Sequence, residues 1–138
     1  MAVQVDYNMT VDLVNPNNNV SSEYPLVQGS LVNVYLTVLE NGNPVTIDDI
    51  DNVNIVVACY CKLDNAPVIL PIEKTELSLA SNGEVFIASG ENITSHAGKC
   101  ALILKYTNGY TTYSTPLYYY VNANPMAGIQ ILPPIVQL

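Results

Sequence analysis

Residues 3–13 read VQVDYNMTVDL, and their alternation of apolar and polar side chains decides the fold class. The odd-numbered positions are apolar or aromatic, and the even-numbered positions carry Gln, Asp, Asn and Thr. Successive side chains of a β-strand point to opposite faces of a sheet, so this period of two predicts a long, half-buried strand. The turn-forming cluster at 15–19, NPNNN, is expected to end it.

The same period recurs along the chain and predicts an all-β protein. Further strands are expected at 29–39, 52–62, 67–72, 77–79, 84–89, 99–106 and 110–121. Asn108-Gly109, between the last two, is the strongest short hairpin signal, and Asn41-Gly42 predicts another tight turn. About seven or eight strands, with turn signals roughly every 8–12 residues and no convincing helix, predict an immunoglobulin-like antiparallel β-sandwich over residues 1–121.

The composition excludes several classes of function. The 138 residues include four basic residues, all of them lysines, and 12 acidic residues, with a net charge of -8. Binding to nucleic acid requires basic side chains that displace phosphate counterions, so no nucleic-acid partner is expected. No apolar run approaches the roughly 18 residues of a membrane span, so no membrane partner is expected. Hydrophobic residues make up 49%, which excludes a disordered chain.

The first residues give an expectation about the cellular compartment. Residues 1–13 have neither a basic region nor the continuous apolar stretch of a secretory signal. The protein is therefore expected to be made in a cytoplasm and not to be secreted.

Charge is unevenly distributed along the chain. Residues 1–91 hold all 12 acids and two lysines, whereas 92–138 hold only Lys99 and Lys105. The last segment, 122–138, reads NANPMAGIQILPPIVQL, and its prolines predict an extended apolar tail outside the sandwich. Docking on a partner is expected, with docking on its own sandwich and a free end as alternatives. The expected contact residues of the tail are Ile129, Ile131, Leu132, Ile135, Val136 and Leu138.

Tyrosines crowd the last predicted hairpin. Tyr118 and Tyr120 share one face of a strand, whereas Tyr119 joins the opposite face. One face must be core, so the other presents aromatic surface, either as a protein interface or as a cross-strand ladder that stabilises the sheet. The interface interpretation names Tyr110, Tyr113, Tyr118 and Tyr120.

Two clusters could carry chemistry. Cys59, Cys61 and Cys100 are interpreted as small core residues, with a metal or nucleophilic site that includes His96 as the alternative. The acidic cluster at 48–51 is interpreted as a solvated turn, with weak cation binding as the alternative. We therefore predict no catalytic, metal-binding or cofactor-binding residues and no enzymatic activity.

The spacing of turns and strands carries a family resemblance. It includes Asn82-Gly83-Glu84-Val85-Phe86-Ile87 and the closing strand Ser114-Thr115-Pro116-Leu117-Tyr118-Tyr119-Tyr120-Val121. With the strand at 5–13, Gln28-Gly29 and Asn41-Gly42-Asn43-Pro44, this pattern resembles the N-terminal domain of the upper baseplate protein of phages that infect Gram-positive bacteria, and related fibre-anchoring or head-fibre modules. The chain departs from that pattern at Ser30, where the family often has an acidic residue, and in having the tail from 122 instead of a long receptor-binding region.

The resemblance implies a non-enzymatic virion structural protein that is made in the host cytoplasm. It implies a module that anchors or forms a fibre or decoration on a baseplate or capsid, with baseplate, capsid or fibre subunits as partners. A homo-oligomer is expected, and a trimer if the protein is fibre-associated. The alternative is an immunoglobulin-like adhesin domain that binds carbohydrate or a cell surface through Tyr110 and Tyr113.

Overall fold

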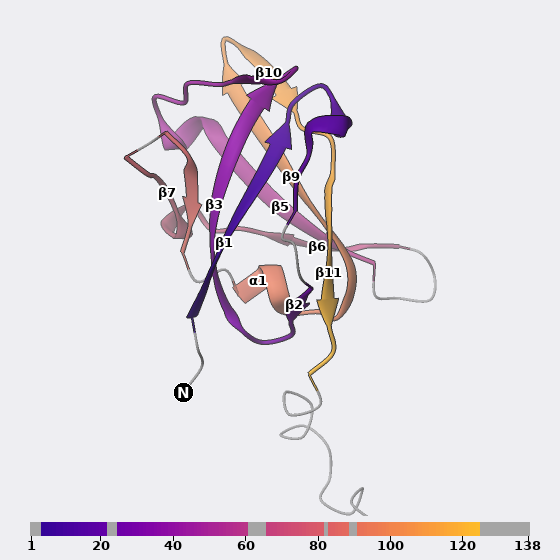
Figure 1. The fold of residues 1–138 in the computed structure, drawn as a ribbon. Helices are drawn as coiled ribbons and strands as arrows, with labels where there is room; N and C mark the ends of the chain where they lie inside the picture. Colours follow the sequence, from indigo (N-terminus) through magenta and orange to yellow (C-terminus); the bar gives the residue numbers. More distant parts are fainter. Residues whose placement is uncertain (1–3, 22–24, 61–65, 82, 89–90, 125–138) are drawn as a thin grey trace, which may run out of the picture.

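The computed structural model describes residues 4–21, 25–60, 66–81, 83–88 and 91–124, which form two β-sheets packed face to face (Figure 1). The five-stranded sheet consists of β1 (Gln4–Asp12), β3 (Leu31–Glu40), β4 (Asn43–Pro44), β7 (Leu77–Leu79) and β8 (Val85–Ile87). The six-stranded sheet consists of β2 (Leu26–Val27), β5 (Val53–Cys59), β6 (Val68–Pro71), β9 (Gly98–Asn108), β10 (Tyr110–Tyr113) and β11 (Leu117–Asn122).

Single helical turns connect some of the strands. Three are 3₁₀ turns, η1 (Pro16–Asn18), η2 (Ile50–Asn52) and η3 (Lys74–Glu76), and the fourth is the α-helical turn α1 (Glu91–Thr94). None of the helices in the described ranges is long and apolar enough to cross a bilayer.

The predicted all-β sandwich is confirmed, but its sheets are mixed rather than purely antiparallel. β1 pairs with β3 in parallel, and β2 pairs with β11 in parallel. Two parallel neighbours need a crossover connection, and here the chain leaves β1, joins the opposite sheet as β2, and returns as β3. The one-residue alternation is the same in parallel and antiparallel strands, so the sequence pattern does not distinguish them.

The strand expected at 110–121 is interrupted by a bulge. Tyr113 pairs with Lys105 and Leu117 pairs with Leu102, so three residues on this strand face two on β9. The Ser114 hydroxyl accepts the Leu104 backbone N–H at 2.9 Å within the bulge. The extra residue shifts the alternation, and Tyr113 therefore points to the same outer side as Tyr118 and Tyr120.

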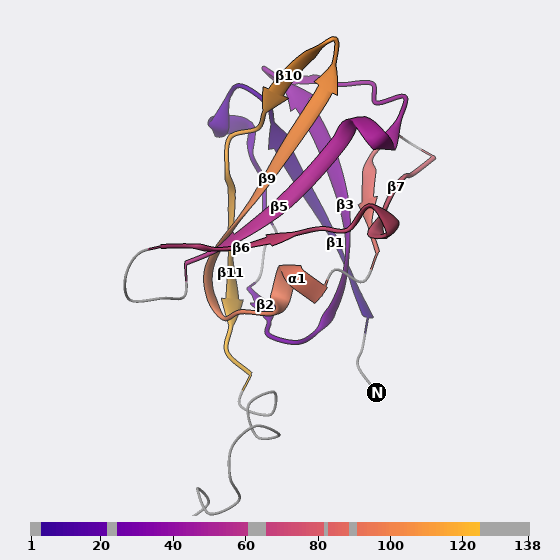
Figure 2. The ribbon, with the colours of Figure 1, turned by 180° about the vertical axis from the view of Figure 1, so that it is seen from behind.

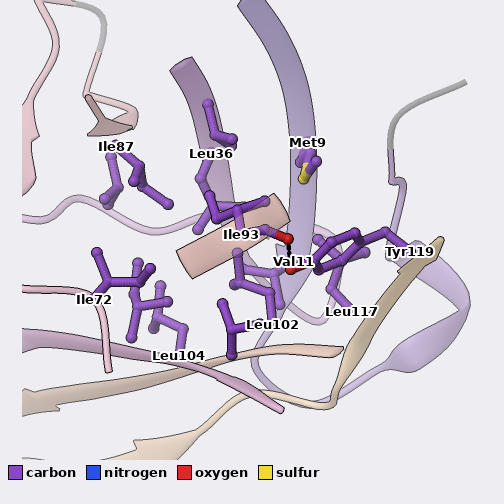
Figure 3. Packing of buried hydrophobic residues seen from close by; sticks show 14 of the residues in the cluster. Met9, Val11, Leu36, Ile72, Ile87, Ile93, Leu102, Leu104, Leu117 and Tyr119 are labelled. Carbon is purple, nitrogen blue, oxygen red and sulfur yellow. Dashed lines mark hydrogen bonds between the residues drawn. The ribbon is translucent and has the colours of Figure 1, made fainter. Parts of the chain in front are cut away.

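The core lies between the sheets and is closed at its lower end by α1. Met9, Leu36, Ile87 and Leu102 are almost completely buried there, as Figure 3 shows. Ile93 of α1 points into the same core, and its carbonyl accepts the Tyr119 hydroxyl at 2.8 Å. Burial raises the pKa of Tyr119, so this phenol remains a neutral donor.

A buried carboxylate, Asp12, fastens the upper end of β1. It accepts the backbone N–H groups of Val14 and Asn15, each at 2.8 Å, and the Asn18 side-chain amide at 2.9 Å. It also accepts the N–H groups of the β3–β4 turn, Asn41 at 3.0 Å and Gly42 at 2.8 Å. Burial alone would raise the pKa of this carboxyl, but the hydrogen bonds outweigh burial and hold the pKa well below its usual value.

Candidate interaction surface

The outer face of the six-stranded sheet carries most of the exposed tyrosines. Figure 2 views the molecule from the side on which β5, β6 and β9 lie in front. Tyr118 and Tyr120 are 48% and 54% exposed, Tyr113 is 62% exposed and Tyr60 is 39% exposed. We call the aromatic and apolar part of this surface, with its two lysines, the tyrosine face: Tyr60, Tyr113, Tyr118, Tyr120, Val56, Ala58, Ile69, Pro71, Lys99, Ala101, Ile103 and Lys105. The outward residues Asn54, Thr107 and Thr111 border it towards the β9–β10 hairpin.

The strand register places these side chains in rows across the sheet. The central row runs from Tyr118 through Ala101 and Ala58 to Ile69, which is 54% exposed. Both alanines are buried, between the larger side chains at the two ends of the row. Cross-strand neighbours on one face are in contact distance, so the row forms one continuous apolar surface.

The next row towards the lower end combines aromatic rings with a cation. Tyr120 pairs with Lys99, and the Tyr60 N–H donates to the Lys99 carbonyl at 2.9 Å. The Lys99 ammonium lies 4.3 Å from the centre of the Tyr118 ring, which is a cation–π contact. No Asp or Glu lies among the outward-facing described residues of β5, β6, β9, β10 and β11.

The sequence-based division of the closing strand is confirmed. Leu117, Tyr119 and Val121 are buried, whereas Tyr118 and Tyr120 are exposed. The hydroxyl groups of the two inward tyrosines are hydrogen-bonded inside the sandwich. Tyr106 donates to the Thr46 carbonyl at 3.4 Å, and Tyr119 donates to the Ile93 carbonyl of α1.

Tyr110 does not belong to the tyrosine face. It pairs with Asn108 at the tip of the β9–β10 hairpin and is 86% exposed. The alternation of the strand places the Tyr110 side chain on the side that faces the other sheet. The hairpin tip extends past the end of the core, so this side chain is exposed there. There it borders a hollow of about 260 Å³ between this hairpin and the β3–β4 hairpin, lined by Leu13, Glu40, Val45, Thr46, Tyr106, Asn108, Tyr110 and Thr112.

The expected contact residues of the tail lie outside the described residues. These are Ile129, Ile131, Leu132, Ile135, Val136 and Leu138. The chain is described as far as Asn124, which is hydrogen-bonded to Gln28 at the lower end of the six-stranded sheet.

The described cysteines and Asp49 lie in structural positions. Cys59 and Cys100 are cross-strand partners that are fully buried in the core, and Cys61 lies outside the described residues. His96 contacts the Ser95 hydroxyl through Nδ1 at 2.9 Å. Asp49 caps η2 by accepting the Asp51 N–H at 2.9 Å. In the described part of the chain, no group of three His, Cys, Asp or Glu side chains is placed to hold a metal ion.

Sequence reasoning missed the part of the face that β5 and β6 contribute. Tyr60, Ala58 and Ile69 join Tyr118 and Lys99 only through strand pairing. One signal was available, because the outward positions of β5 from Val56 to Tyr60 are as apolar as its inward positions. A strand that is apolar on both sides is covered on both sides or presents a contact surface.

Comparison with protein-family models finds no matching family, and comparison with curated proteins finds no significant match.

Proposed function

We propose that this protein is a non-enzymatic virion structural protein, a β-sandwich module that anchors or forms a fibre or decoration on a phage baseplate or capsid. The tyrosine face would be its contact with neighbouring subunits, in a homo-oligomer or with other virion proteins. The resemblance in turn and strand spacing supports the phage assignment, and the tyrosine face supports the structural role.

The single observation that carries the proposal is the chemistry of this face. It combines exposed Tyr118, Tyr120 and Ile69 with buried alanines and has no described carboxylate. Interface cores are enriched in aromatic residues and depleted of charge, and the solvated surface of a monomer rarely carries such a row.

Mass spectrometry of purified particles tests the assignment directly. Particles released by the host that carries the gene should contain this chain together with the other structural proteins. A Tyr118→Ser/Tyr120→Ser variant supplied in place of the wild type should be lost from the particles, whereas Tyr110→Ser, which removes an exposed tyrosine outside the face, should be retained. Particles that contain the expected structural proteins but never this chain would overturn the proposal.

A second candidate function is carbohydrate binding, and the hollow beside Tyr110 favours it. Its volume of about 260 Å³ would admit one or two sugar rings, with the Tyr110 ring for stacking and Glu40 and Asn108 for hydroxyl groups. A glycan array distinguishes the candidates. Binding that is lost in Tyr110→Ser and kept in Tyr118→Ser/Tyr120→Ser would support the adhesin function, and an array without any bound glycan would remove it.

A further inference from the structure

We infer that the tyrosine face binds residues 125–138 of a second copy of this chain, so that copies join head to tail. The inference rests on the proposed function in one respect, because it takes the tyrosine face to be a subunit contact. It adds the identity of the segment that this contact receives.

The path of the chain at the lower end of the six-stranded sheet is fixed by hydrogen bonds. Val121 pairs with Leu26, and the Gln28 N–H donates to the Asn122 carbonyl at 2.9 Å. Asn124 then donates its backbone N–H to Gln28 Oε1 and its side-chain amide to the Gln28 carbonyl, each at 3.3 Å.

These bonds keep the chain in the plane of the sheet as far as Asn124. The last described residue therefore lies at the lower end of the six-stranded sheet, just past the end of β11 (Figure 1). Asn124 lies at this end of the sheet and not in the middle of the tyrosine face, so we take the segment that follows it to be available to a neighbouring copy.

The chemistry of residues 125–138 matches that of the face. The segment reads PMAGIQILPPIVQL and has no charged side chain, so its burial removes no charged side chain from water. Its branched aliphatic residues would cover the row from Tyr118 to Ile69. That row spans four strands, or about 15 Å, and 14 extended residues reach about 45 Å.

The sequence of the segment includes Pro133 and Pro134, and aromatic surfaces bind proline-rich sequences. Consecutive prolines favour the polyproline II conformation, which exposes carbonyl groups and loses little entropy on binding. Tyr118 and Tyr120 lie two residues apart on one strand, with rings to pack against proline and hydroxyl groups to donate to the exposed carbonyls.

Each copy then offers one face and one segment, which makes the contact heterologous. Such contacts close into a ring when the rotation between copies allows it and otherwise extend into a filament. A closed trimer is one such ring, and its mass would be three times that of the 15.0 kDa chain.

Complementation between two full-length variants tests the inference. The face variant, Tyr118→Ser/Tyr120→Ser, keeps its segment but cannot receive one. The segment variant, Ile131→Asp/Ile135→Asp, keeps its face but cannot donate. Each alone should be monomeric by light scattering. Their equimolar mixture should form a complex of two chains, because it retains one intact face and one intact segment.

Two controls make the outcome decisive. Adding Tyr118→Ser/Tyr120→Ser to the segment variant should weaken binding to the face variant by about 30-fold, as expected for loss of a hot-spot tyrosine. A synthetic peptide of residues 125–138, titrated into the isotope-labelled segment variant, should shift the backbone amides of Lys99, Ala101 and Tyr118. This second measurement needs no substitution in the sandwich and therefore does not depend on the folding of the face variant.

The inference would be overturned if the wild type associates but the two variants remain monomeric when mixed. The contact would then be face to face, or the segment would bind within its own copy. A peptide that shifts none of these amides would also overturn it. The proposed virion role is tested separately. If the two variants complement each other but the protein is absent from particles, the virion role fails and this inference stands. If the protein is present in particles but the variants do not complement each other, this inference fails and the virion role stands.

Discussion

The two sheets share one core, but their outer faces differ in chemistry. On the five-stranded sheet, polar side chains bond to one another across strands. The Asn33 amide donates to Asp6 at 2.9 Å, and the Thr37 hydroxyl donates to Glu84 at 2.8 Å. On the six-stranded sheet, the tyrosine face holds tyrosine, isoleucine, valine, proline and alanine with two lysines, and the outward polar residues Asn54, Thr107 and Thr111 lie towards the β9–β10 hairpin.

This difference indicates where a protein with a net charge of -8 can be contacted. On the five-stranded sheet, Asn33 and Thr37 are bonded to the carboxylates of Asp6 and Glu84, and Tyr35 lies against Phe86. The tyrosine face presents rings whose hydroxyls have room for new partners. Stability should therefore depend on polar groups at the five-stranded sheet, and association should depend on the tyrosine face.

The largest effect on stability is expected from Asp12→Ala. This change leaves the N–H groups of the β1 end and of the β3–β4 turn without their acceptor, and we expect the free energy of unfolding to fall by about 3 kcal/mol. Urea unfolding measures the change. Asp48→Ala, an exposed acid between β4 and η2, should change it by less than about 0.5 kcal/mol, and equal losses in the two variants would contradict this role of Asp12.

Acid should destabilise the protein through the same carboxylate. The folded-state pKa of Asp12 lies below the unfolded value of about 3.9, so the stabilisation is fully present above that value and is lost as the pH falls below it. Unfolding free energies measured between pH 7 and pH 2 should decrease towards low pH in the wild type. The decrease should be smaller in Asp12→Asn. If the free energy of unfolding falls equally with pH in both proteins, the acid sensitivity comes from other groups.

Adjacent tyrosines on β11 should differ in their effect on stability. Tyr119→Phe removes the buried donor to the Ile93 carbonyl, and we expect a loss of about 1 kcal/mol. Tyr118→Phe removes an exposed hydroxyl and should stay within about 0.5 kcal/mol of the wild type. Thermal unfolding of both variants gives the comparison, and a larger loss from Tyr118→Phe would contradict the assignment of the two faces.

The smallest effect is expected from Thr37→Val on the five-stranded sheet. This change removes the hydrogen bond to Glu84 but keeps a β-branched side chain, so the loss should be about 0.5 kcal/mol. The mass in solution, measured by light scattering, should not change. Dissociation of an oligomer by this variant would place a subunit contact on the five-stranded sheet and contradict the role of the tyrosine face.

Much of the fold could be predicted from the sequence because burial on one side of a strand leaves a period of two. The alternation at 3–13 and the opposite orientations of Tyr118 and Tyr119 followed from it, and the structure confirms both over the residues it describes. The parallel pairing of β1 with β3 could not be predicted, since the alternation is independent of strand direction.

Two further features depend on contacts between distant parts of the chain. Asp12 occupies a polar position of the alternating strand, which predicts a surface residue, but the turn at Asn41 and Gly42 encloses it. The bulge at 114–116 shifts the alternation between β10 and β11, so that Tyr113 lies on the same face as Tyr118 and Tyr120. Neither register nor turn packing is visible in local periodicity.

The central claim is that the tyrosine face joins copies of this chain, and light scattering on full-length variants tests it most directly. The wild type should have a mass that is a multiple of 15.0 kDa, and Tyr118→Ser/Tyr120→Ser should be a monomer. Tyr35→Ser removes a tyrosine that stacks on Phe86 on the opposite outer face, and this variant should keep the wild-type mass. A monomeric wild type, or an oligomer that dissociates with Tyr35→Ser and persists with the face variant, would contradict the claim.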